Sequence, residues 1–183
     1  MQMIANELKA AGTPESRIIY LDLDKREYRN VVTADKLESL IMSKCETEEM
    51  KYLFIDEVQN VKDFETVLNG FRTEGNWSIF ITGSNSYLLS GELVTKLTGR
   101  YIEFEIFPLN FQEYEGMKAF FGKPINSNPM IELTNYILEG SFPRAILFDD
   151  MADKRKYVQG VVSEIFEKDI RKRLKIKDKE NFE

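Results

Sequence analysis

Two adjacent carboxylates, Asp56 and Glu57, are the residues whose types and spacing most directly suggest chemistry. They follow the short apolar run 52–55, which is bounded by polar residues and typical of a strand buried on both faces. In an open α/β sheet, ligands bind just beyond the carboxyl ends of such strands. One carboxylate there could help to hold Mg²⁺ while its neighbour polarises an attacking water, as in phosphoryl transfer. The alternative is a strand that simply runs into an acidic turn.

The elements that must position these acids are strands that alternate with helices. Residues 17–24 and 77–82 have the pattern of strands, and the second of these ends in the small polar run 83–86. Amphipathic helices are expected after Thr33 and after Asp63, with each of these residues as the N-cap. This alternation predicts a mainly parallel sheet with helices on both faces, which is an α/β fold.

The later part of the chain changes character. A further strand is expected at residues 101–107, and Asn110 with Glu113 resembles the capping box of a following helix lined by aromatic side chains. Residues 122–129 are rich in Pro and Asn, which marks the best internal boundary, and only helical patterns follow. The sequence therefore predicts an α/β core over residues 1–122 and a helical part over residues 123–183.

Composition excludes several classes of function. The 183 residues contain no histidine, which removes Ser/His and Cys/His catalysis and His-ligated metals, and the single Cys45 cannot form an internal disulfide. A cytoplasmic, reducing setting is therefore expected. The net charge of -6 argues against wholesale binding to nucleic acid or membrane. No apolar run approaches the roughly 18 residues of a membrane span.

Four motifs carry a family resemblance: LFIDEVQ at 53–59, FITGSNS at 80–86, LTGR at 97–100 and FPLNFQEY at 107–114. In this order they resemble the prokaryotic AAA+-type ATPase family, P-loop NTPases whose members carry an uncharacterised C-terminal domain. The resemblance runs from about residue 4 to the end of the chain. It implies that the helical part is the small lid that follows an AAA+ core, and then the start of the C-terminal domain.

The resemblance also implies roles for the two acids and for their neighbourhood. Asp56 matches the Walker B acid that holds the metal, and Glu57 matches the catalytic base. Ser84 and Asn85 lie where the sensor-1 residue follows the fourth strand, and Asn85 is the preferred candidate. Ordinary turn chemistry after a strand is the alternative for both of these polar residues.

Two further residues have roles by resemblance. Arg100 lies where many AAA+ proteins place an arginine finger, which acts on a neighbouring subunit's nucleotide; the alternative is an arginine that caps a helix end. Gln59 completes the DEVQ signature and would contact either the attacking water or a backbone group. Arg144 is a loose match to a lid sensor arginine.

One expected element is missing from these residues, the glycine-rich GxxxxGK[ST] loop that binds phosphates. In the family this loop and its strand lie just upstream of the helix expected at residues 1–11, and the strand separates those at 77–82 and 101–107. ATP and Mg²⁺ are thus implied for an intact parent, while this chain alone is expected to bind neither and to be inactive. Because the flanking strands lose their shared neighbour, we expect them to pair directly or the chain to form a homo-oligomer, with a dimer favoured.

Three functions remain open at this point. The first is the core of an AAA+-type ATPase, and the second is a non-catalytic protein-interaction module derived from one. The third is a helicase-like segment, because DEVQ and a small polar strand end resemble helicase motifs, although nothing here resembles a second lobe with paired arginines. The target, whether protein or nucleic acid, cannot be inferred.

Overall fold

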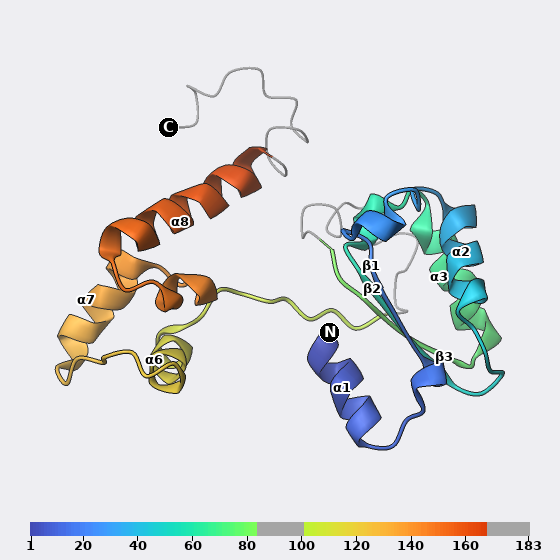
Figure 1. Ribbon diagram of the computed structural model, residues 1–183, viewed down its shortest axis with the longest axis horizontal. Helices are drawn as coiled ribbons and strands as arrows, with labels where there is room; N and C mark the ends of the chain where they lie inside the picture. The colour runs from blue at the N-terminus through green and yellow to red at the C-terminus, as the bar shows by residue number, and fades with distance from the viewer. Residues whose placement is uncertain (84–100, 168–183) are drawn as a thin grey trace. The chain divides into compact units, whose positions relative to one another are not determined.

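The computed structural model describes residues 1–83 and 101–167 of the chain. The chain divides into two compact units, Met1–Ile102 and Glu103–Glu183, each with its own internal contacts (Figure 1).

The first unit is built on a three-stranded parallel sheet. The strands are β1 (Ile18–Asp22), β2 (Lys51–Asp56) and β3 (Trp77–Ile81), and β2 lies between the other two. The helices within residues 1–83 are α1 (Gln2–Ala10), α2 (Ala34–Ser43) and α3 (Phe64–Glu74). The α/β class and the parallel pairing are therefore confirmed.

The period of two along each strand sorts the side chains onto two faces. On one face Tyr20, Phe54 and Phe80 lie opposite one another, and their rings stack across the three strands. The other face packs with α2 and α3, which lie together on that side of the sheet (Figure 1). The most deeply buried residues of this core are Leu21, Leu37, Ile41, Leu53, Ile55, Val58, Val61 and Phe64.

The helix starts in this unit are placed as expected, but the capping contacts differ. Thr33 and Asp63 are the N-cap residues of α2 and α3, yet neither side chain makes the capping hydrogen bond. Asp63 has a left-handed backbone with φ 58°, which differs from the extended conformation usual at an N-cap. The prediction of these two caps was correct in position and wrong in mechanism.

In the second unit, residues 103–167 form three helices and a short 3₁₀ segment. They are α6 (Phe111–Phe120), α7 (Pro129–Glu139), η4 (Pro143–Leu147) and α8 (Met151–Ile165). The capping box at the start of α6 is confirmed, because Asn110 Oδ1 accepts from the Glu113 amide and Glu113 Oε2 accepts from the Asn110 amide, each at 2.9 Å. Asn128 and Asp150 cap α7 and α8 through their side-chain oxygens.

The strand expected at residues 101–107 is not formed, and its direct pairing with β3 is absent from the described residues. The segment has no strand neighbour in that part of the chain, and its apolar side chains are exposed, with Ile102 at 82% and Ile106 at 89%. Alternating apolar residues suit a strand, but a strand also needs a partner for its backbone groups. The prediction was wrong because the sequence pattern does not supply that partner.

The aromatic stripe expected along α6 is only partly a core. Tyr114 is fully buried, whereas Phe120 is 82% exposed and Phe121 is 42% exposed. Both lie at the end of the helix, and the buried position in the last turns belongs to Lys118 instead.

Candidate functional site

The acid pair lies where β2 ends. Asp56 is the last residue of β2, and Glu57 follows with φ 58° and ψ 47°, in the left-handed region. That conformation is uncommon for residues other than glycine, and strained backbones of this kind cluster at functional sites. The chain then enters the 3₁₀ turn η3 (Val58–Asn60), so the two acids stand on a sharp turn rather than on a continued strand.

Thr82, the residue directly after β3, fixes this turn with its backbone. Its amide donates to the Ile55 carbonyl at 2.9 Å, and its carbonyl accepts from the Val58 amide at 3.0 Å. Its side chain contacts both acids, because the hydroxyl donates to Asp56 Oδ1 and accepts from the Glu57 amide at 3.3 Å. The ends of β2 and β3 are thereby held together at the candidate site.

Gln59 contacts the second acid from within the turn. Its Nε2 donates to Glu57 Oε2, so the contact of Gln59 is with a side chain of the site rather than with a backbone group. The other atom of its amide, Oε1, is buried and has no hydrogen-bond partner in the described part of the chain. Buried polar atoms are normally satisfied, so this oxygen is a candidate contact for a ligand or water.

A tyrosine and an acid from β1 border the same end of the sheet. Asp22 is the register partner of Asp56. The pKa of the Tyr20 hydroxyl is raised, first because burial disfavours the phenolate, and then because the charges of Asp56 and Asp22 and a hydrogen bond with Asp56 do the same. Beyond β1, Asp24 Oδ1 accepts from the Asn60 side chain at 3.1 Å, which ties this loop to η3.

The donor set fits a magnesium ion that is shared with a phosphate ligand. Mg²⁺ is usually held by one or two carboxylates and completes its shell with waters and substrate phosphates. Asp56, with one oxygen already oriented by Thr82, meets that requirement. Among residues 1–83 and 101–167, no group of three or more acidic or Cys side chains is arranged to hold a metal without such a ligand.

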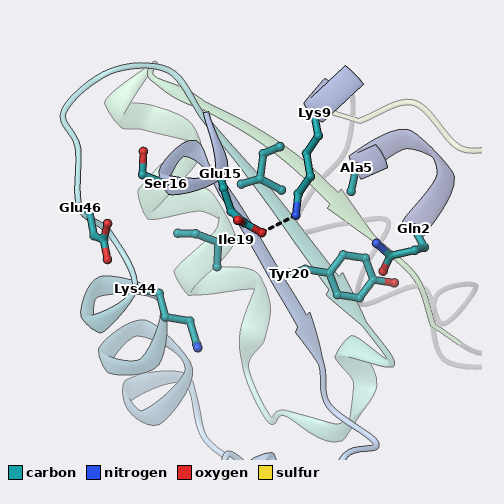
Figure 2. Close-up of a pocket in the computed structure, with 10 residues that line it drawn as sticks. Gln2, Ala5, Lys9, Glu15, Ser16, Ile19, Tyr20, Lys44 and Glu46 are labelled. Carbon is teal, nitrogen blue, oxygen red and sulfur yellow. Dashed lines mark hydrogen bonds and ion pairs between the residues drawn. The ribbon is translucent and has the colours of Figure 1, made fainter. Parts of the chain in front are cut away.

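A cavity of about 520 Å³ lies on the α1 side of β1, with Tyr20 among the residues that line it (Figure 2). Figure 2 shows Lys9 and Glu15 pointing toward each other, with Gln2 near the Tyr20 ring. Lys9 Nζ and Glu15 Oε1 form an ion pair and lie 2.5 Å apart. Lys44 and Glu46 approach from the end of α2. The lining thus carries charges of both signs, which selects no single ligand chemistry.

The structure brings together three of the six predicted site residues, Asp56, Glu57 and Gln59. The other three, Ser84, Asn85 and Arg100, lie outside the described residues. Arg144 is exposed in η4 of the second unit.

Sequence reasoning missed Thr82 and Tyr20 as members of the site. The signal for both was the register of a parallel sheet. Thr82 ends the segment beside β2, and Tyr20 lies two residues before the partner of Asp56.

The parallel sheet and the paired acids at the end of its central strand are consistent with an α/β fold of the P-loop NTPase type. Residues 1–115, more than half of the chain, match a family described as an AAA domain, and the chain belongs to this family.

The sequences of curated relatives match most of this chain. An uncharacterized protein of Haemophilus influenzae is 34% identical over 175 residues, which cover 93% of this chain and 42% of that protein. Two uncharacterized proteins of Methanocaldococcus jannaschii are 33% and 27% identical, covering 87% and 88% of this chain and 37% and 31% of their own lengths. The chain thus spans less than half the length of these relatives. No solved structure matches it. In the described residues, no helix is long and apolar enough to cross a membrane.

Proposed function

We propose that this chain supplies the acidic half of an ATP-hydrolysing site in an AAA-type ATPase. The observation that carries the proposal is the pair Asp56 and Glu57 at the carboxyl end of the central parallel strand, with Glu57 on a left-handed turn. Membership of the AAA domain family supports it, because that family is AAA-type and ATPase-like.

In this proposal the two acids have separate tasks. Asp56, oriented by Thr82, would hold Mg²⁺, and Glu57 would accept a proton from, or polarise, the attacking water. Gln59 holds the Glu57 carboxylate through one oxygen, which limits the directions from which a water can approach. When bound, Mg²⁺ would neutralise charge on the transferring phosphate.

The remaining roles rest on the family resemblance. Asn85, or Ser84, would orient the water or the γ-phosphate, and Arg100 would reach the nucleotide of a neighbouring subunit. Such an arginine requires an assembly, so we propose a homo-oligomer, with a dimer as the smallest form. The exposed apolar residues of the segment 101–107 also favour association (Ile102, Phe104, Ile106 and Phe107).

The exposed apolar residues of the segment 101–107 also favour the second candidate function, a protein-interaction module without catalysis. Light scattering at high protein concentration separates association from its absence. We expect a dimer or larger species, and a monomer under these conditions would contradict the assembly and with it the trans role of Arg100.

The test of catalysis uses a form of the protein that carries a GxxxxGK[ST] loop ahead of residue 1, since the 183 residues contain none. We expect Glu57→Gln to abolish most ATP turnover and to leave ATP binding intact, because the amide cannot act as a base. Glu38→Gln, an exposed change on α2, is the matched control and should leave turnover unchanged. Turnover at the wild-type rate in Glu57→Gln would contradict the role of Glu57.

A further inference from the structure

We infer that Thr82 is a positioning residue that sets both acids of the site through one hydroxyl group. The inference rests on the proposed function, because it assigns Thr82 a part in the reaction that Asp56 and Glu57 would perform. The juxtaposition that carries it is the Thr82 hydroxyl between the Asp56 carboxylate and the Glu57 amide.

The chemistry of the contact requires a hydroxyl. A threonine hydroxyl offers one donor and acceptor lone pairs, and here both capacities are used. The donor fixes Asp56 Oδ1, on a carboxylate that also hydrogen-bonds with Tyr20. The acceptor receives the Glu57 N–H at 3.3 Å. A valine of similar shape can make neither contact, whereas a serine can make both.

The backbone of Glu57 explains why the second contact matters. Left-handed backbones cost free energy in residues with a Cβ and persist only where the surroundings fix them. Of the groups around Glu57, the Thr82 hydroxyl contacts its amide and Gln59 contacts its carboxylate. The direction of the Glu57 side chain therefore depends on a residue that belongs to the end of a different strand.

A purely structural role for Thr82 is carried by different atoms. Its backbone amide and carbonyl already join β3 to Ile55 and Val58 at 2.9 and 3.0 Å, and any residue except proline could make both bonds. The hydroxyl adds nothing to that pairing and is directed at the two acids. Removing the hydroxyl while keeping the backbone bonds thus separates positioning from simple closure of the sheet.

The kinetic arm of the test compares Thr82→Val with Thr82→Ser in a form of the protein that hydrolyses ATP. We expect Thr82→Val to lower kcat roughly 10- to 100-fold, as loss of an outer contact to a metal-holding or catalytic group does. The KM for ATP should change little, and Thr82→Ser should restore most of the rate. Wild-type kcat in Thr82→Val would overturn the inference.

The second arm needs no ATP and uses the 183-residue chain. Amide hydrogen exchange is measured at Glu57 and at Val58, whose bond to the Thr82 carbonyl serves as an internal control. We expect Thr82→Val to exchange about 2- to 10-fold faster at Glu57, the effect of one lost hydrogen bond, with no change at Val58. Thr82→Ser should behave as wild type.

Thr73→Val removes a hydroxyl that bonds the carbonyls of Asn69 and Gly70 in α3, so it is the matched control and should leave both site amides unchanged. Equal acceleration at Glu57 and Val58 in Thr82→Val, or none at either, would overturn the inference. Absence of turnover in every variant would instead contradict the proposed function, and the exchange data would still decide the role of Thr82.

Discussion

The two units of this chain bury very different material. The first has an apolar core between its sheet and the pair α2 and α3, together with the aromatic stack on the opposite face of the sheet. In its described residues, 103–167, the second unit packs α6, α7 and α8 around a small apolar set, Tyr114, Ala145 and Ile146, and around buried charges, Lys118, Glu132 and Lys154. The first therefore depends mainly on non-directional apolar burial, although Lys51 and Glu65 are buried there too. The second depends to a larger extent on directional polar contacts.

The polar network of the second unit links α6, α7 and α8. Lys118 on α6 pairs with Glu132 on α7, and Glu132 Oε2 also accepts from the Asn126 amide at 2.8 Å. Glu139 on α7 accepts from the Tyr114 hydroxyl at 2.8 Å and pairs with Lys154 on α8 at 2.6 Å. Every charge in this network has an opposite charge beside it, which is what permits their burial.

The difference shows where each unit is vulnerable. A charge pair that is buried contributes modestly while it is intact, but removing one partner leaves an uncompensated charge in the interior. An apolar core loses only the transfer and cavity contributions of the atoms removed. Removing one charge of the buried network should thus lower the stability of the second unit sharply. The same change should leave Asp56 and Glu57 in place in the first unit.

The largest expected effect is the loss of stability when the buried ion pair between Lys118 and Glu132 is broken. Glu132→Leu should lower the free energy of unfolding of the second unit by about 3–5 kcal/mol, because Lys118 is left buried without its partner. The double variant Lys118→Met with Glu132→Leu should recover most of that loss. Asp149→Ala, which breaks an exposed pair with Lys123, is the control and should change little.

The single tryptophan allows the unfolding of the first unit to be followed separately from that of the second. Trp77 lies in β3, so its fluorescence follows the first unit, while far-ultraviolet circular dichroism follows the helices of both. We expect Glu132→Leu to shift the dichroism transition in urea and to leave the fluorescence transition in place. A shift of both by the same amount would show that the units do not have separate cores.

A smaller effect on the stability of the second unit is expected when the pH is lowered. Burial alone would raise the pKa of Glu132, but hydrogen bonds from Lys118, Asn126 and Asn135 and the charge of Lys118 outweigh it and lower the pKa below 4.5. The stabilisation is therefore complete above pH 4.5 and is lost as the pH falls through the lowered value. The dichroism transition of the double variant should depend less on pH in this range than that of wild type. Identical pH dependence would remove Glu132 as the source.

The smallest expected effect is on the pKa of Tyr20, which lies on the edge strand β1 of the first unit. Asp56→Asn should lower the pKa of Tyr20, because it removes a negative charge that disfavours the phenolate, while the effects of burial and of Asp22 remain. Absorbance of the phenolate during a titration, compared with a Tyr20→Phe variant to assign the signal, measures the change. An unaltered Tyr20 titration would show that Asp56 does not act on this hydroxyl.

Much of the first unit could be predicted from the sequence because its signals are local. The apolar run before Asp56 and the helical spacing in α3 fix which segments are strands and helices. Their alternation is enough to predict the parallel sheet. The acid pair was found for the same reason, since it directly follows the strand.

What escaped prediction depends on contacts between segments. The role of Thr82 requires the register of β3 against β2, which no single segment encodes. The pairing of Lys118 with Glu132 spans two helices, and the pattern of α6 predicted an aromatic face instead. The segment 101–107 has the composition of a strand but lacks a neighbour among the described residues.

We propose that Asp56 and Glu57 form the acidic half of an ATP site whose phosphate loop is not among these 183 residues. Calorimetric titration with MgATP tests it most directly, on the 183-residue chain and on a form that carries a GxxxxGK[ST] loop ahead of residue 1. We predict no measurable binding at millimolar MgATP for the first, and micromolar affinity for the second. Micromolar binding by the 183 residues alone, or none by the form with the loop, would contradict the account.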